Sequence, residues 1–325
     1  MQGSSSRRQF LASAGVAILG GISGCADSSS NPTEAATSTV PTTATETRSQ
    51  PESTTAETTA VETTSVPAGM WRSFQSNAAN TGTSESPSPF GGTEHWVFDT
   101  DGGVFSSPAV DERALYVGSR DGTLYAIDRT DGTSMWQFPT RDELLSSPAI
   151  ANGVAYIGSV TGTVHVVSAD SGGEQWRFQE PDEPVTSSPT VADGTVVIGT
   201  RGGTLYGLNE SNGNEQWQFR AGRQGRTAPA VVDGTVYVAS YDGNVYALDV
   251  ADGRELWTFE TDGVVESSPT VASRRVYVGS ADANVYAIDA ADGTEQWRFE
   301  AGGPIRVSSP AVVDGTVYVG SFDGY

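Results

Sequence analysis

The sequence predicts an all-β protein, a β-propeller of four-stranded antiparallel blades, and two regular spacings carry this prediction. Tryptophans recur 40 or 41 residues apart, at Trp96, Trp136, Trp176, Trp217, Trp257 and Trp297. The prolines of a motif that is Ser-Ser-Pro in most copies recur with the same spacing, at Pro108, Pro148, Pro189, Pro229, Pro269 and Pro310. A fixed period of this length is typical of propellers and solenoids.

The content of one repeat favours the propeller over a solenoid. Residues 275–279 and 285–288 are short runs of β-branched and aromatic residues, and no run has a helical period. Asp-Gly pairs such as Asp233-Gly234 separate similar runs in other repeats, and such pairs supply the positive φ angles of tight hairpins. We therefore expect four strands per blade: A from the Ser-Ser-Pro motif onward, then B, C and a strand D that contains the tryptophan.

About six blades are visible in the sequence. Five repeats are complete, residues 94–98 form a D strand without its A, B and C strands, and residues 308–325 form A and B strands without C and D. We expect these two parts to make one blade split between the termini. The missing C strand also fits truncation from a larger ring, and residues 70–82 could cover the gap.

The first 25 residues are expected to be an export signal. Arg7 and Arg8 lie in a run, SRRQFL, that resembles the twin-arginine motif, and the apolar residues 11–22 are too few to span a bilayer. The run ISGC resembles a lipobox that ends at Cys25, the predicted lipid attachment site and the only cysteine. The alternatives are an uncleaved amphipathic anchor or an ordinary signal with a chance cysteine.

Two further regions complete the predicted organisation. Residues 26–69 are rich in Thr and Ser with almost no large apolar residue, so they are expected to be a disordered tether. The tether is either a glycosylated stalk or an undecorated spacer. Residues 70–325 form the propeller, which is therefore expected to be exported and anchored to the outer face of the cell membrane.

The charge of the chain is strongly negative. Forty acidic residues stand against 18 basic ones, a formal net charge of −22, and every basic residue is an arginine. Abundant acid without lysine resembles the proteins of extremely halophilic archaea, in which concentrated salt screens the repulsion. The same balance argues against nucleic-acid binding, which needs cationic side chains to neutralise phosphates.

A family resemblance becomes specific at residues 287–297, AIDAADGTEQW. This run resembles the tryptophan-docking motif of PQQ-like (quinoprotein-type) propeller repeats, and it recurs at residues 126–136 and 247–257. It is degenerate in two repeats, where Ser168 and Asn209 replace the aspartate. The resemblance implies that the six tryptophans named above are structural and dock each blade against its neighbour.

One candidate binding site stands out in the loops. Residues 220–226 contain three arginines, and alternating strand direction places them on one face with arginines of B–C turns and of another D–A link. The candidate anion or partner site therefore comprises Arg220, Arg223, Arg226, Arg120, Arg201 and Arg306. The hypothesis is a site for a carboxylate, a sulfated glycan or an acidic partner. The alternative is that these arginines pair with local acids, for example Arg226 with Glu266.

Nothing in the sequence indicates catalysis. His165 stands where other repeats have tyrosine, His95 stands at a variable position, and no cysteine follows Cys25, so no metal site is expected. Quinoprotein dehydrogenases with similar blades add a vicinal cysteine pair, calcium ligands and a catalytic aspartate in longer insertions. Since this chain lacks such additions, we expect no cofactor, PQQ with calcium included, and no enzyme activity.

The sequence thus predicts a non-catalytic binding or scaffold lipoprotein, a monomeric ring that resembles BamB-type propeller lipoproteins. Its loops would act on a protein or glycan partner. The alternatives are a quinone (PQQ)-dependent oxidoreductase of alcohols or sugars, and a truncated remnant of a larger propeller.

Overall fold

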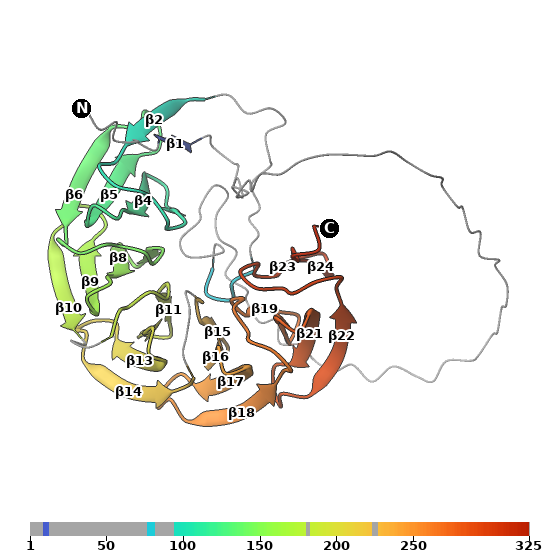
Figure 1. Cartoon of the computed structure of the whole chain (residues 1–325). Coiled ribbons are helices and arrows are strands. Elements are labelled where there is room, and N and C mark those ends of the chain that lie inside the picture. The colour runs from blue at the N-terminus through green and yellow to red at the C-terminus, as the bar shows by residue number, and fades with distance from the viewer. Residues whose placement is uncertain (1–8, 13–76, 82–93, 180–182, 223–226, 325) are drawn as a thin grey trace, which may run out of the picture. The chain divides into compact units, whose positions relative to one another are not determined.

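The computed structural model describes residues 9–12, 77–81, 94–179, 183–222 and 227–324, and these contain β-strands and no helix (Figure 1). Five four-stranded antiparallel sheets form blades I to V, each a meander in chain order. Blade I comprises β3 (Ala109–Val110), β4 (Ala114–Gly118), β5 (Thr123–Asp128) and β6 (Ser134–Pro139). Blade II comprises β7 (Ala149–Ala151), β8 (Val154–Gly158), β9 (Thr163–Ser168) and β10 (Glu174–Gln179).

The same order of strands continues in the next three blades. Blade III comprises β11 (Thr190–Ala192), β12 (Thr195–Gly199), β13 (Thr204–Asn209) and β14 (Glu215–Arg220). Blade IV comprises β15 (Ala230–Val232), β16 (Thr235–Ala239), β17 (Asn244–Asp249) and β18 (Glu255–Glu260). Blade V comprises β19 (Thr270–Ala272), β20 (Arg275–Gly279), β21 (Asn284–Asp289) and β22 (Glu295–Glu300). In every blade these are strands A, B, C and D, as the sequence predicts.

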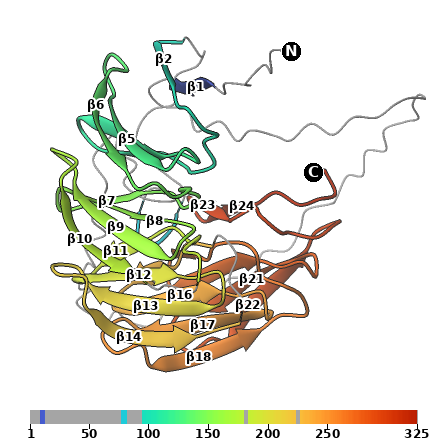
Figure 2. The same ribbon diagram turned by 60° about the vertical axis from the view of Figure 1, so that its left-hand side comes forward.

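The blades succeed one another around a common axis, which confirms the predicted propeller. Strands A of neighbouring blades contact each other, so they lie innermost (Figure 1). Strands D are outermost, and Figure 2 shows β6, β10, β14 and β18 following one another along the outer side.

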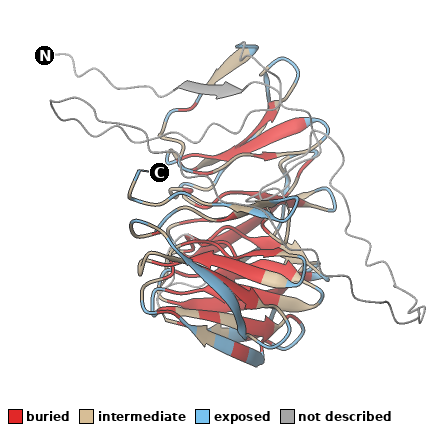
Figure 3. Ribbon diagram, turned by 90° about the vertical axis from the view of Figure 1, so that its right-hand side faces the viewer, coloured by how far each residue is buried: buried red, intermediate tan, exposed pale blue. Residues whose placement is uncertain are grey.

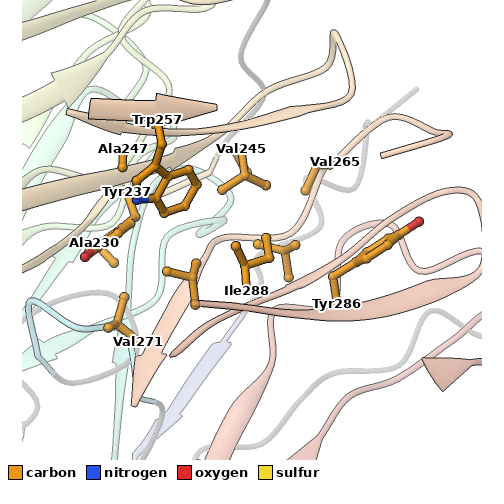
Figure 4. Packing of buried hydrophobic residues seen from close by; sticks show 12 residues of the cluster. Ala230, Tyr237, Val245, Ala247, Trp257, Val265, Val271, Tyr286 and Ile288 are labelled. Atoms are coloured by element: carbon orange, nitrogen blue, oxygen red, sulfur yellow. The ribbon is translucent and has the colours of Figure 1, made fainter. Parts of the chain in front are cut away.

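Burial along the strands explains their composition. Strands B and C are buried on both faces because a neighbouring blade covers each side, and β4 and β12 are buried at every residue. Strands D are more exposed: β10 alternates between exposed and partly buried positions, and every residue of β22 is exposed, on the side of the molecule that Figure 3 shows. The apolar core is divided into clusters between blades: Figure 4 shows the one where Trp257 and Tyr237 of blade IV meet Tyr286 and Ile288 of blade V.

The A–B turns of blades II to V are tight hairpins with two successive residues in the left-handed region. In blade II, Asn152 has a φ of 49° and Gly153 a φ of 74°. In blade IV, Asp233 has a φ of 49° and Gly234 a φ of 73°. This is the backbone of a type I′ turn, for which Asn-Gly and Asp-Gly are the favoured sequences. Blade V has Ser273-Arg274 there, with φ of 49° and 60°, so its hairpin is held by the flanking strands without a glycine.

The strands at the two ends of the repeats lie in separate two-stranded sheets. The strand β2 (Trp96–Asp99) pairs with β1 (Gln9–Ala12), and β23 (Ala311–Val313) pairs with β24 (Thr316–Tyr318). The split blade that the sequence predicts lacks a C strand, and its B strand β24 and D strand β2 accordingly lie in separate sheets. The physical reason is that a blade places strand C between strands B and D, so β24 and β2 cannot pair directly.

The pairing of β1 with β2 uses the register of strands C and D in the complete blades. Ala12 lies opposite Trp96, as Ala126 lies opposite Trp136 in blade I. The remaining export-signal residues, Arg7, Arg8 and Cys25, and the predicted tether at 26–69 lie outside the described residues. Within the described part, no helix is long and apolar enough to cross a membrane.

A candidate functional site on the link face

The B–C turns and the D–A links lie together, and we call the surface that they form the link face. Backbone hydrogen bonds join the turns of blades I, II, III and V to the link that precedes each blade. The N–H of Arg120 donates to the carbonyl of Gly103 over 3.0 Å, and that of Arg201 donates to the carbonyl of Pro184 over 2.8 Å. The links are therefore held against the blades rather than projecting from them.

A carboxylate reinforces this junction in three blades. In blade IV, one oxygen of Asp242 accepts a hydrogen bond from the N–H of Gly222 in the link and another from the Tyr246 hydroxyl, each over 2.8 Å. Asp121 makes equivalent contacts with Gly102 and Tyr125, and Asp282 with Asp262 and Tyr286. We call this arrangement the turn carboxylate.

In blades II and III the carboxylate comes from the link instead. The B–C turn has Thr161 where blade I has Asp121, and its hydroxyl donates to Asp142 of the link over 2.8 Å. In blade III the turn has Gly202, and a Cβ on it would lie 2.1 Å from a carboxylate oxygen of Glu183. In these two blades the carboxylate therefore lies on the link side of the same junction. The sequence spacing could have predicted these pairs, because the contacting link and turn positions are 19 or 20 residues apart.

The pKa of Asp242 is lowered, and the pKa values of the tyrosines that donate to the turn carboxylates are raised. Burial opposes ionisation of Asp242, but hydrogen bonds from Tyr246, the N–H groups of Asn244 and Gly222, and Ser240 lower its pKa overall. Burial, and then the hydrogen bond to Asp242, raises the pKa of Tyr246 to about 12. These groups therefore hold fixed charges near neutral pH, which suits structural anchors rather than proton transfer.

Two of the six candidate arginines are engaged with neighbouring acids. Arg120 forms a bidentate ion pair with Glu143, with distances of 3.0 and 2.8 Å, and its guanidinium lies over the ring of Phe105. Arg306 lies 3.5 Å from Glu266. Glu266 is the acid with which the sequence analysis, as its alternative to a binding site, paired Arg226. Both Arg226 and Arg223 lie outside the described residues.

The other two described candidates, Arg201 and Arg220, are exposed and form no ion pair within the described part of the chain. Both lie at the same end of blade III. Arg220 ends β14 opposite Thr204, and Arg201 lies in the turn that leads to Thr204. The structure therefore divides the predicted cluster into paired arginines on other blades and two unpaired arginines on blade III.

The two histidines differ in environment. His165 is buried in β9, and neither ring nitrogen has a hydrogen-bond partner among the described residues. Burial lowers its pKa from 6.5. Its ring contacts Phe138 edge-on, as the equivalent tyrosines contact phenylalanines in other blades, so its position is one of packing. His95 is exposed ahead of β2.

A short segment of the chain itself lies against strands A near the axis. Residues 77–81 accept hydrogen bonds from the N–H groups of Val231, Val271 and Val312, which belong to three successive A strands. The buried amide of Asn80 donates to three carbonyls, those of Ala228, Pro229 and Pro269, each over 3.2 Å. This anchoring role of Asn80 was not predicted from the sequence, which offers no local signal for contacts so far along the chain.

No group of three or more His, Cys, Asp or Glu side chains in the described part of the chain could hold a metal ion, such as the calcium that accompanies a quinone cofactor. Near the axis, residues 77–81 form hydrogen bonds with backbone groups of blades IV and V. We therefore derive no chemical step through such a cofactor.

The tryptophans of strand D join the blades. Five of them donate an indole N–H to a backbone carbonyl in the next blade over 2.7 to 3.1 Å: Trp96, Trp136, Trp176, Trp217 and Trp257. Each ring lies over a glycine three residues beyond that carbonyl, where a Cβ would come within 2.4 to 2.8 Å. The sixth tryptophan, Trp297, differs because it is 39% exposed.

Meander blades, docking tryptophans and a link face without long insertions define the chain as a PQQ-like β-propeller repeat protein. A family profile described as "Outer membrane protein assembly factor BamB" matches residues 82–228 and 210–324. The chain belongs to this family. No curated protein matches the sequence.

Solved structures share the fold. BamB from Moraxella catarrhalis is 19% identical with a TM-score of 0.52, and the match covers 67% of this chain and 82% of that one. The quinohemoprotein alcohol dehydrogenase ADHIIG from Pseudomonas putida HK5 is 17% identical with a TM-score of 0.59, and the match covers 71% of this chain and 48% of that one. The quinohemoprotein alcohol dehydrogenase from Comamonas testosteroni is 15% identical with a TM-score of 0.63, and the match covers 75% of this chain and 52% of that one. The chain thus spans about half the length of these dehydrogenases.

Proposed function

We propose that this chain is a non-catalytic binding or scaffold lipoprotein, anchored through Cys25 at the outer face of the cell membrane, whose link face holds an anionic group of a protein or glycan partner. One observation carries the proposal: Arg201 and Arg220 are exposed at the same end of blade III without a carboxylate partner in the described residues. In a chain of net charge −22, two unpaired arginines at one place favour an external anion.

The chemistry of arginine supports this assignment. A guanidinium presents its N–H donors in a planar fork that matches carboxylate and sulfate groups in bidentate geometry. Concentrated salt screens long-range attraction, with a Debye length of about 3 Å at 1 M, so only groups in direct contact retain their interaction. A partner of this protein would be recognised by contact geometry rather than by net charge.

The rigidity of the link face also supports a binding role. Backbone bonds tie the turns of blades I, II, III and V to their links, and carboxylates reinforce the junction in blades I to V. A rigid surface loses little conformational entropy when it binds, which favours recognition by surface complementarity. Membership of the BamB family is consistent with a scaffold that acts through its loops.

Binding of two defined anionic polymers tests the proposal. The full chain is titrated with dextran sulfate and with poly-glutamate at about 0.1 M and about 1 M KCl. The double variant Arg201→Gln/Arg220→Gln should weaken binding of at least one polymer about tenfold at both salt concentrations. The matched control Arg120→Gln/Arg306→Gln removes two arginines that already have acid partners, so its affinity should stay within about twofold of the parent. Equal losses in both variants, or none, would contradict the proposal.

The likeness to quinohemoprotein alcohol dehydrogenases makes an oxidoreductase the second candidate. The described residues offer no cluster of calcium ligands, which is why we place it second. A ligand that binds only the native state must raise the melting temperature. Calorimetric unfolding of the full chain with PQQ and calcium decides between them: an upward shift would favour the oxidoreductase, and an unchanged melt agrees with the scaffold.

A further inference from the structure

The innermost edges of strands A repeat the same backbone groups around the axis, and residues 77–81 occupy three of them. The segment lies beside β15 and β19 in Figure 1. Each of three successive strands donates one N–H to it: Val231 to the carbonyl of Ala78 over 2.7 Å, Val271 to that of Ala79 over 2.9 Å, and Val312 to that of Thr81 over 3.2 Å. The chain itself therefore shows which ligand chemistry this edge accepts.

Blades I, II and III present the same N–H group in the same register. Val191 lies opposite Val196 in the A–B hairpin of blade III, just as Val231 lies opposite Val236 in blade IV. The equivalent residues of blades I and II are Val110 and Ile150. Because the register is shared, these three N–H groups also point away from strand B. None of the three donates to a residue in the part of the chain that the structure describes.

The side chain of Asn80 occupies a second repeated position, the carbonyl of the proline that precedes strand A. Thr190 of blade III donates its hydroxyl to the carbonyl of Pro229 in blade IV over 2.7 Å, and blade V makes the equivalent bond to the sheet that follows it. Blade IV has Ala230 at the position of this threonine. There the amide of Asn80 donates to the carbonyl of Pro269 over 3.2 Å. The asparagine thus supplies a donor where the blade has alanine.

Blades I and II also have alanine at this position. Ala109 and Ala149 cannot donate to the carbonyls of Pro148 and Pro189, and no other described residue donates to them. The axial edge of blades I to III therefore repeats the pattern that the chain fills on blades IV and V. The two surfaces are continuous, because β11 of blade III contacts β15 of blade IV.

We propose that this edge binds a turn of a partner protein that presents backbone carbonyls and an asparagine side chain. The axial site comprises the N–H groups of Val110, Ile150 and Val191 and the carbonyls of Pro148 and Pro189. Val110 and Val191 are partly exposed. The inference does not depend on the proposed role of the arginines on the link face.

Residues 77–81 specify the conformation of the occupant. The N–H of Asn80 donates to the carbonyl of Asn77 over 3.0 Å, and the N–H of Thr81 donates to the Asn77 side chain over 3.2 Å. The carbonyls of four successive residues, 78–81, accept hydrogen bonds from strands A. An extended strand directs only every second carbonyl to one edge, so it would not fit. Asn80 has a φ of 55°, which asparagine adopts more readily than most residues.

The acceptors around the amide also exclude an acidic side chain. The amide of Asn80 is surrounded by the carbonyls of Ala228, Pro229 and Pro269, each at 3.2 Å. A carboxylate in that place could donate no hydrogen bond and would be repelled by the three carbonyl oxygens. The partner's turn must therefore carry asparagine, and aspartate at the same position should prevent binding.

A cyclic peptide with the sequence of residues 76–82 tests the axial site. It is titrated into the full chain labelled with ¹⁵N-valine, in which the resonances of Val110 and Val191 are assigned by replacing each with isoleucine. We expect both amide protons to shift downfield and to exchange more slowly with solvent, while those of Val231 and Val271 stay fixed. The same peptide with aspartate in place of the residue equivalent to Asn80 should bind about tenfold or more weakly.

Two protein variants at one position separate the backbone donor from the side chain. Val191→Pro removes the N–H at a strand edge where the ladder does not use it, a place in which proline is tolerated. Its affinity for the peptide should fall about tenfold. Val191→Ala keeps the N–H, so its affinity should stay within about twofold of the parent. Should Val191→Pro fail to fold, the two peptides still decide the outcome with the unaltered protein.

Three results would overturn the proposal. The first is equal binding of the asparagine and aspartate peptides, or no shift of the Val110 and Val191 resonances at millimolar peptide. The second is slow exchange of both amides in the protein alone at every concentration, which would mean that the chain itself fills the axial site. The third is exchange that slows as protein concentration rises without peptide, which would assign the site to a second copy.

Discussion

At the scale of the residue, blade II differs from the blades around it. Tyr125 and Tyr246 donate their hydroxyls to turn carboxylates, but the equivalent His165 finds no partner for either nitrogen in the described residues. The charged groups near it are Glu174 and Arg177 on β10, which pair with each other over 3.1 Å, and Asp142 in the link. Burial outweighs the two acids and favours the neutral form of this imidazole, so the pKa of His165 is lowered.

His165 should therefore make stability depend on pH below neutrality. Its pKa is lowered from 6.5 in the folded protein, so the unfolded chain takes up the proton first as pH falls. Stability is then fully present above about 6.5 and declines below it. The melting temperature of His165→Tyr should fall less between pH 7 and pH 5 than that of the parent. His95→Gln, which alters the exposed histidine, is the control and should keep the parent's slope.

At the scale of the element, each blade is held by a tryptophan of the preceding strand D and a glycine of its own C–D turn. The sequence predicts the pairs of strands and the docking role because both repeat every 40 or 41 residues. It does not predict which link supplies the carboxylate, because Asp142 and Glu183 are ordinary loop residues until the fold places them beside Thr161 and Gly202. Contacts between loops depend on the packing of blades, not on a local pattern.

Removal of two tryptophans of the same motif should have unequal effects. Trp217→Ala leaves a cavity over Gly253 and removes a hydrogen bond to Val250, so we expect a loss of about 3–5 kcal/mol. Trp297→Ala removes a side chain that is 39% exposed, and its cost should stay below about 1 kcal/mol. Chemical unfolding followed by circular dichroism measures both. Equal losses would mean that Trp297 is covered in solution.

At the scale of the whole molecule, the excess of acid sets the conditions under which the propeller is stable. The ion pairs in the described residues are exposed and few, such as Arg254 with Asp249 at 3.7 Å, so they offset little of a net charge of −22. Repulsion between the remaining carboxylates disfavours any compact state, and added salt screens it.

The melting temperature of the full chain should rise as KCl increases from about 0.1 M to about 1 M, over which the Debye length falls from about 10 Å to about 3 Å. Sodium chloride should have the same effect at equal ionic strength, since screening does not depend on the identity of a monovalent cation. Differential scanning calorimetry at neutral pH measures the change. A melting temperature that is constant or falls with salt would show that repulsion does not limit stability.

The sequence by itself determined the strands, their order within a blade, the tight A–B turns and the family, because each depends on neighbours in the chain or on a period of 40 or 41 residues. It also placed Arg120, Arg201, Arg220 and Arg306 in turns and links of one face. Only the tertiary structure decided which of them have acid partners, that Asn80 joins three carbonyls, and that Trp297 is exposed. These features arise where blades meet, because packing between blades, and not the local sequence, sets which side chains come into contact; the carbonyls that Asn80 joins lie 148 to 189 residues further along the chain.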